Sequence, residues 1–321
     1  MSDKDSITKE YINQPDRFAD LVNGFCFGGE ERIHPDELVE MDTAGVVLPY
    51  GSDGVPYPAQ KARDVLKLSV KTDDKAAYCI LGVENQTAIH TAMPVRNMLY
   101  DAMTLSSQVQ KVARAHRKEK SHGADNAEFL SGFHRNDKVL PVITIVVHWG
   151  ADSWDAPVDL REMYPENVDN RILKYASAYH VNLISPADMT DEQLNVFKSD
   201  IKAVLKFIKH SKNKHELQEL INDDVAYRSL DRLTAQTISV CSSVDFNIPV
   251  GEERVDMCKA IEDMKVDARN EGRDAERNAG MVKLVSTLKN VRVEKDVAVQ
   301  QLSEAYSLTE ADAAAFVNSN W

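Results

Sequence analysis

The chain has 321 residues, 43% of them hydrophobic, and a formal net charge of −13. A chain of this length can bury a sizeable core, so we expect one main domain and an appended one. The longest apolar run, residues 142–147, is too short to span a bilayer, and the first residues lack the apolar core of a signal peptide. The sequence therefore predicts a soluble, cytoplasmic protein with no membrane partner.

The cysteines and histidines show no spacing typical of metal sites. The four cysteines form no CxxC pair, which favours reduced thiols over disulfides or zinc ligands. The nine histidines form no HExxH motif and no His-x-His pair, so we interpret them as structural or surface residues. The sequence also lacks P-loop, GxSxG and dinucleotide-binding motifs, which argues against NTPases, α/β-hydrolases and dehydrogenases.

In chain order, the first helix is expected to begin at Pro15, because proline is favoured at the first helical position. Apolar residues at helical spacing give this helix one stripe that packs on a sheet. The stripe consists of Phe18, Leu21, Val22 and Phe25. Gly28 and Gly29 end the helix. Residues 30–41 predict an acidic turn and a short helix, and residues 45–59 predict a loop rich in Gly and Pro, with a weak strand signal at 46–48.

Two short strands are expected next, over residues 64–70 and from residue 78 to 86. Side chains alternate along a strand, so Glu84 and Gln86 share one face, about 7 Å apart. If the strands pair as a hairpin, the start of the first lies near the end of the second. The pattern therefore predicts that Asp64, Glu84 and Gln86 meet at one end of a sheet.

Two carboxylates and an amide on a rigid sheet suit a hard divalent cation. Mg²⁺ takes oxygen ligands and keeps several waters, and a substrate phosphate can share its coordination. The chemistry that this arrangement implies is metal-assisted hydrolysis of a phosphodiester. The alternative, from spacing alone, is that the carboxylates of Asp64 and Glu84 are merely solvated at a strand end.

A long helix is expected to begin at Pro94 and to lie on the sheet. Its expected buried face contains Val95, Met98, Leu99, Ala102, Val109, Val112 and Ala113. Arg96 and Tyr100 are neighbours on one flank of this helix, where the arginine can pack over the tyrosine ring. Residues 140–149 then predict a central strand covered on both faces, and residues 181–184 predict a further strand.

The rest of the chain reads as helical. A capping box at 190–193 opens one helix, and residues 223–242 predict another. Residues 267–280 have almost no apolar side chains, which indicates a solvated helix or a flexible connection. Short helices over 282–288 and 297–306 and a last one after a capping box at 307–310 are expected to follow. This tail is a candidate surface for homo-oligomers.

Charge bears on the choice of partner. A net charge of −13 is unfavourable for nucleic-acid binding, but basic residues cluster locally. The first cluster, which we predict to contact nucleic acid, comprises Lys111, Arg114, Arg117 and Lys118, with His116 and Lys120 beside them. A second group of six lysines, between residues 198 and 214, is interpreted as the solvated face of a helix.

Asp64, the Glu84-Asn85-Gln86 triplet and residues 93–100 together resemble the Rpn family of recombination-promoting nucleases, transposase-like members of the PD-(D/E)XK nuclease superfamily. The similarity extends to residues 4–9, 17–20, 131–133, 140–150, 154–155, 181–186 and 270–273. The sequence departs from the superfamily pattern at Gln86, where many members carry Lys. Gln occurs at this position in Rpn-like sequences, although it cannot offer a positive charge to a phosphate.

The resemblance implies an α/β fold with a restriction-endonuclease-like core, a mixed sheet flanked by helices, and an appended C-terminal helical region. The expected divisions are a nuclease-like domain over 1–190, a helical extension over 191–250 and a charged helical tail over 251–321. The implied function is a Mg²⁺-dependent DNA endonuclease, with Mn²⁺ as an alternative metal, linked to recombination or mobile elements. Another reading is a nuclease-like binding module that has lost cleavage.

The resemblance also assigns roles to residues. Asp64 and Glu84 are expected to hold the metal, and Gln86 is expected to orient a water or the phosphate by hydrogen bonds, since an amide cannot act as a base at neutral pH. Asp20, on the first core helix, is a candidate third acid, with a surface aspartate as the alternative. Arg96 and Tyr100 are expected beside the catalytic strands, where the arginine either contacts a phosphate by a bidentate fork or only packs over the Tyr100 ring.

Overall fold

A computed structural model describes residues 3–41, 64–71, 77–121, 123–242, 244, 248 and 251–321. The chain divides into two compact units, Met1–Met257 and Cys258–Trp321. The expected boundary at residue 190 therefore falls inside the first unit. No helix in the described part of the chain is long and apolar enough to cross a membrane.

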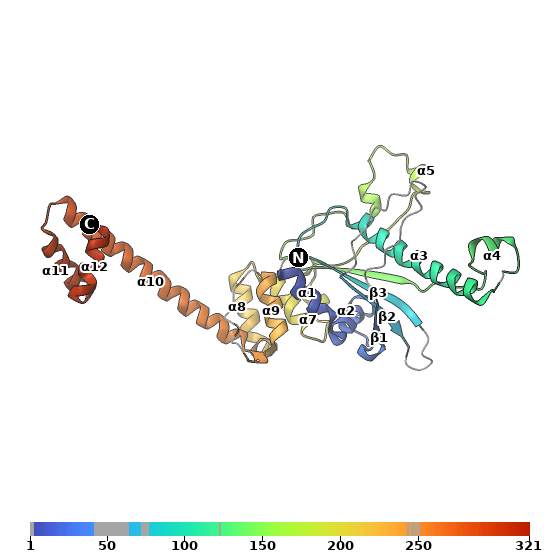
Figure 1. The fold of residues 1–321 in the computed structure, drawn as a ribbon, viewed down its shortest axis with the longest axis horizontal. Coiled ribbons are helices and arrows are strands. Elements are labelled where there is room, and N and C mark those ends of the chain that lie inside the picture. Colours follow the sequence, from blue (N-terminus) through green and yellow to red (C-terminus); the bar gives the residue numbers. More distant parts are fainter. Residues whose placement is uncertain are drawn as a thin grey trace. The chain divides into compact units, whose positions relative to one another are not determined.

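A five-stranded mixed sheet forms the centre of the first unit (Figure 1). Its strands, in spatial as well as chain order, are β1 (Leu38–Glu40), β2 (Val65–Val70), β3 (Ala77–Gln86), β4 (Val142–His148) and β5 (Asn182–Ile184). The first three strands pair antiparallel, whereas β3, β4 and β5 pair parallel. The expected α/β class, hairpin and buried central strand are thereby confirmed.

Helices cover the sheet and extend the unit. They are α1 (Asp3–Asn13), α2 (Pro15–Phe27), α3 (Met93–Glu119), α4 (Asn126–Ser131), α5 (Asn170–Leu173), α6 (Asp191–Leu194), α7 (Ile201–His210), α8 (Lys214–Asp223) and α9 (Arg232–Ser242). Single 3₁₀ turns lie at Pro35–Glu37, Leu160–Met163, Pro186–Asp188 and Val225–Arg228, and the short strands β6 (Leu230–Asp231) and β7 (Arg254–Val255) form a separate pair.

The two faces of the sheet are packed differently. On one face, Met93 at the start of α3 packs on Val146 of β4 and on Val181. On the other, Tyr11 of α1 contacts the ring of Trp149 edge-on, and the ammonium of Lys67 on β2 lies over the ring of Phe18 of α2. Because neighbouring residues of a strand point to opposite faces, each strand reaches both layers.

Helices α7 and α9 belong to the core of the first unit rather than to an independent extension. The Asp20 carboxylate of α2 accepts hydrogen bonds from the backbone N–H groups of Lys198 and Ser199, just before α7. The Arg17 guanidinium of α2 bonds to the Asp231 carboxylate and the Thr234 hydroxyl at the start of α9. The capping box at Thr190 is present, although the helix it opens ends after four residues.

Several expectations for the first unit are wrong. A helix, α1, precedes the one expected as the first, and the helix expected over 223–242 begins only at Arg232, after a 3₁₀ turn and β6. Residues 30–41 contain a 3₁₀ turn and β1 instead of a short helix. Val95, Met98 and Leu99, expected on the buried face of α3, are 36–49% exposed, and the buried residues of its first turns are Met93, Pro94, Asn97 and Tyr100. The weak strand signal at 46–48 lies outside the described residues.

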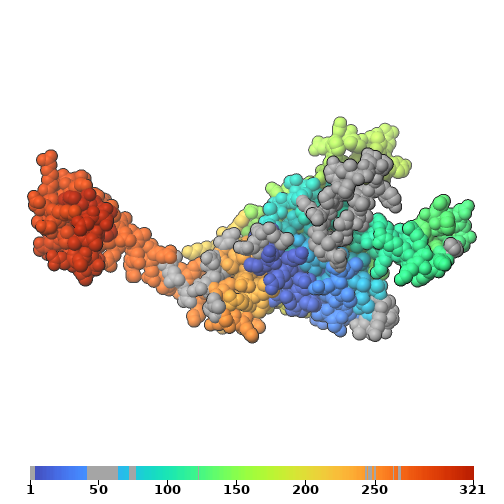
Figure 2. All heavy atoms as spheres, in the orientation of Figure 1, coloured from blue at the N-terminus to red at the C-terminus, as the bar shows by residue number. Residues whose placement is uncertain are grey.

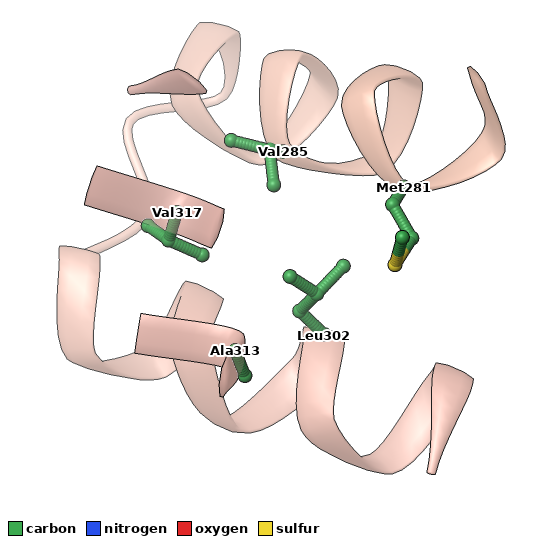
Figure 3. Close-up of a cluster of buried hydrophobic side chains, with 5 residues drawn as sticks. All are labelled: Met281, Val285, Leu302, Ala313 and Val317. Carbon is green, nitrogen blue, oxygen red and sulfur yellow. The ribbon is translucent and has the colours of Figure 1, made fainter. Parts of the chain in front are cut away.

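The second unit consists of the long helix α10 (Met257–Asn290), α11 (Lys295–Tyr306) and α12 (Glu310–Asn320). Five apolar side chains from the three helices point toward one another (Figure 3): Met281, Val285, Leu302, Ala313 and Val317. The sequence of residues 267–280 indicates either a solvated helix or a flexible connection. The helix is correct, since α10 runs through these residues without interruption. The cap of α12 is Thr309, whereas Ser307 ends α11 in a left-handed conformation.

Candidate functional site

Asp64 and Glu84 lie together at one end of the sheet. In the antiparallel pairing of β2 with β3, Val65 is opposite Val83, which places Asp64 opposite Glu84. The Asp64 Oδ2 atom accepts a hydrogen bond of 2.8 Å from the backbone N–H of Asn85. The hairpin thus holds the Asp64 carboxylate against the backbone N–H of Asn85, the residue that follows Glu84.

Arg96 joins the start of α3 to this strand end. Glu84 is fully buried, and its Oε2 atom lies 3.2 Å from a guanidinium nitrogen of Arg96. The Nε–H of Arg96 donates to the Tyr100 hydroxyl at 3.2 Å, as expected for neighbours one helical turn apart. The expected packing over Tyr100 is present, and Arg96 keeps a quarter of its side-chain surface in solvent; its contact with a phosphate stays a prediction.

Asn85 and Gln86 are held by Trp149, the residue that follows the neighbouring strand β4. The Asn85 side-chain oxygen accepts a hydrogen bond from the Trp149 indole at 2.8 Å, and the Gln86 carbonyl accepts one from the Trp149 backbone at 2.9 Å. The Gln86 amide nitrogen donates to the Asn85 carbonyl at 3.0 Å. These bonds order the triplet at the carboxyl end of β3.

A cavity of about 330 Å³ opens at this end of the sheet. It is lined by Asp5, Asp64, Asn85, Gln86, residues 87–90 and Arg96. Asp5 is a carboxylate that the sequence analysis did not single out, and it accepts a hydrogen bond from the Thr87 hydroxyl at 3.2 Å. Asp5, on α1, therefore adds a carboxylate to a cavity that the Arg96 guanidinium of α3 also lines.

The electrostatics of the cavity centre on Asp64. Burial raises the pKa of the Asp64 carboxyl, and the hydrogen bond from Asn85 and the charges of Lys9 and Arg96 oppose that rise. Burial lowers the pKa of Arg96, but its bond to Tyr100 and the negative charges of Glu84 and Asp64 outweigh this and leave that pKa raised. Arg96 therefore stays charged between the two carboxylates, and Asp64 is an acid that gains from a nearby cation.

Asp20, the candidate third acid, lies elsewhere and has a different role. Its two carboxylate oxygens accept hydrogen bonds from the N–H groups of Lys198 and Ser199 and from the Ser199 hydroxyl, at 2.6 to 3.0 Å. This bonding fixes the segment before α7 on α2. Among the acids of the N-terminal helices, Asp5 rather than Asp20 reaches the cavity.

The basic residues predicted to contact nucleic acid lie along α3. Lys111, Arg114, Arg117 and Lys118 are exposed on its C-terminal half. Tyr100 is only 5% exposed, so its ring is not available for stacking on a base. In the second lysine group, Lys198 pairs with Glu31 and Lys209 with Asp191, in agreement with a solvated mixed-charge surface.

Two histidines and an aspartate cluster in the structure, although the histidines show no metal-site spacing in the sequence. Ligand atoms of His116, His134 and Asp137 all lie within 4.8 Å of one another. His116 comes from α3, whereas His134 and Asp137 lie three residues apart in the loop after α4, so the cluster forms only because the chain folds back after α3.

No protein-family model, curated protein or solved structure matches this chain. Its function is therefore inferred from its own residues and from the resemblance of its Asp64 and Glu84-Asn85-Gln86 motif.

Proposed function

We propose that the protein is a Mg²⁺-dependent endonuclease that hydrolyses phosphodiester bonds in DNA. The observation that carries this proposal is the placement of Asp64 opposite Glu84 at the sheet end, beside a cavity with further oxygen donors. The chain order α2, β1, β2, β3, α3, β4, with an antiparallel hairpin followed by a helical crossover to a parallel strand, supports a restriction-endonuclease-like core. The link to recombination or mobile elements comes from the Rpn resemblance alone.

The donor set fits a hard cation. Asp64, Gln86 and Asp5, which offer carboxylate and amide oxygens, line the cavity. Glu84 is not among the lining residues, but its carboxylate pairs with Arg96, which is. Mg²⁺ prefers such oxygen ligands and keeps waters around it. When bound, it would lower the pKa of a water and neutralise charge that develops on the phosphate. Asp64 and Glu84 would hold it, and Mn²⁺ accepts the same donors.

Arg96 is suited to bind the phosphate. Its guanidinium is fixed by Glu84 and Tyr100, lines the cavity and keeps part of its surface exposed. A guanidinium forms paired hydrogen bonds to phosphate oxygens, and a fixed one loses little entropy when it does so. Gln86 adds an amide that can orient the phosphate or a water by hydrogen bonds.

The exposed basic residues of α3 provide a path for the DNA backbone away from the cavity. Lys111 and Lys118 follow Arg96 by fifteen and twenty-two residues on one helix, or about 22 and 33 Å along its axis. Cations at these distances can neutralise phosphates remote from the bond that is cut, even though the whole chain is acidic.

Nicking of supercoiled plasmid DNA by the purified chain tests the proposal. We expect cleavage with Mg²⁺ or Mn²⁺, no cleavage with EDTA, and a loss of at least ~100-fold in Asp64→Asn, since that variant removes a charged metal ligand but keeps an acceptor for the Asn85 N–H. Asp223→Asn, at an exposed aspartate that ends α8, is the matched control and should cleave normally.

The competing function is a nuclease-like module that binds nucleic acid without cutting it. A binding assay over a salt series, run beside the nicking assay, separates the two. Binding that weakens with salt, with no cleavage under any metal condition, would favour the binding module over the endonuclease. Full cleavage by Asp64→Asn would refute the site itself.

A further inference from the structure

The cluster of His116, His134 and Asp137 lies at the far end of α3 from the cavity, in a lobe made by the end of α3, α4 and the loop that follows (Figures 1 and 2, green). His116 Nε2 is 2.9 Å from Asp137 Oδ2. The imidazoles of His116 and His134 are stacked, with ring centroids 3.8 Å apart. All three side chains are half-buried.

The lobe is folded so that these residues meet. After α3 the chain turns back at Lys120, which has a left-handed φ of 54°, and Asp125 caps α4. The buried Glu128 accepts hydrogen bonds from the backbone of Ala124 at 2.6 Å and of Arg135 at 2.9 Å, and so ties both ends of the excursion together. The arrangement of the cluster is therefore set by main-chain contacts.

Asp137 is held in place as an anion. Its Oδ2 atom accepts the backbone N–H of His134 at 2.6 Å in addition to the contact with His116. The bond from the His134 backbone, followed by the contact with His116 and the histidine charges, lowers the pKa of the Asp137 carboxyl. A carboxylate has about four acceptor positions, so these two contacts leave room for a further ligand.

The donor set distinguishes this cluster from the cavity at the sheet end. Two imidazoles and one carboxylate are typical ligands of zinc and of other divalent transition metals, whereas Mg²⁺ prefers oxygen alone. Ligand atoms around a tetrahedral Zn²⁺ are about 3.3 Å apart, given metal–ligand distances of ~2.0–2.1 Å. The 2.9 Å between His116 and Asp137 is close to that edge, and the third ligand atom lies within 4.8 Å.

We propose that His116, His134 and Asp137 bind a divalent transition metal, with Zn²⁺ the best match. The metal would take the place of the proton between His116 and Asp137, and the His134 ring, which is stacked on that of His116, would turn so that one of its nitrogens points at the metal. Three protein ligands leave a fourth position for water or an anion. Both histidines line a cavity of about 170 Å³, together with charged residues of both signs, Arg117, Lys120 and Glu128.

Zinc titration of the full chain against a chromophoric chelator tests this site. We expect one Zn²⁺ bound per chain at this site, and affinity reduced at least ~10-fold in His116→Gln and in His134→Gln. His215→Gln, at an exposed histidine of α8 that pairs with Glu219, is the matched control and should bind as the parent does. The titration is run in the Asp64→Asn background, so that the sheet-end cavity does not contribute.

Co²⁺ provides a second readout that does not depend on variant stability. A tetrahedral Co²⁺ site gives intense visible absorption, which the parent chain should show and which Zn²⁺ should displace. Circular dichroism checks that the variants are folded. If the parent chain binds neither metal, or if both histidine variants bind Zn²⁺ as tightly as the parent, the proposal is wrong. Plasmid nicking is a separate measurement, so either proposal can fail without the other.

Discussion

The two ends of α3 carry ionisable clusters that are built in opposite ways. At the first end, Glu84 is fully buried in the sheet and is neutralised by Arg96. At the other end, His116, His134 and Asp137 are half-buried in a lobe held together by turns and main-chain hydrogen bonds. The contrast shows that a charged group can be fixed either by a deep ion pair or by the local path of the chain, and the energetic consequences differ.

Removal of the deep ion pair should have the largest effect. Arg96→Met takes from the buried Glu84 its guanidinium partner, so we expect a loss of about 2–3 kcal/mol in the free energy of unfolding, measured by urea denaturation. The double variant with Glu84→Gln should recover part of this loss, because it removes the buried charge as well. A loss in the double variant equal to the sum of the two single ones would show that the pair is not coupled.

A change in the path of the lobe should have an intermediate effect. Gly132 has a φ of 67°, and a Cβ atom there would lie 3.0 Å from the Cβ of Ala113 on α3. We therefore expect Gly132→Ala to lower the free energy of unfolding by about 1–2 kcal/mol and to weaken Zn²⁺ binding. Gly28 has nearly the same backbone conformation, with a φ of 61°, but open space around the Cβ position.

Gly28→Ala is therefore the matched control for Gly132→Ala. It carries the same left-handed strain without the contact, so it should destabilise the protein less and leave Zn²⁺ binding unchanged. Equal losses in the two variants, with equal Zn²⁺ affinity, would show that the contact with α3 does not shape the lobe.

The smallest effects should appear in the dependence of stability on pH, with opposite signs at the two ends. Burial raises the pKa of Asp64, so its ionisation destabilises the folded state above that pKa and the penalty is relieved as the pH falls. Asp64→Asn should therefore raise the melting temperature at pH 7, and the gain should shrink in acid.

Asp137 should behave in the opposite way. Its pKa is lowered, so its contribution to stability is present above the unfolded value of about 4 and is lost as the pH falls through the folded value. Asp137→Asn should lower the melting temperature at pH 7, and this difference should shrink as the pH falls below about 4 towards the folded value. Melting curves of both variants and of the parent from pH 7 to pH 3 test this contrast. Shifts of the melting temperature with the same sign in the two variants would contradict it.

The elements predicted correctly are those specified by local sequence. The hairpin around β2 and β3 follows from alternation and a polar turn, and β4 follows from its unbroken apolar run. The convergence of Asp64 and Glu84 needed only the hairpin. Gln86 and Asp64 line the cavity. Glu84 pairs with Arg96, which also lines it.

The features that were missed depend on tertiary contacts. The face of α3 that packs on the sheet uses polar residues, such as Asp101, which bonds to Thr144 and Tyr179, so the apolar stripe pointed to the wrong side. Asp5 reaches the cavity only because α1 packs across β2 and β3 through buried residues such as Tyr11 and Ile12. The histidine cluster is made by the fold of the lobe, which no local pattern specifies.

Helix α3 also acts as a spacer of defined length. From Arg96 to His116 it rises about 30 Å, which is close to the ~34–36 Å of one turn of double-stranded DNA. If the substrate is DNA, as we propose, a duplex lying along α3 would present nearly the same groove at Arg96 and at His116. An insertion of two residues within α3 would rotate one end by more than half a revolution and break that match.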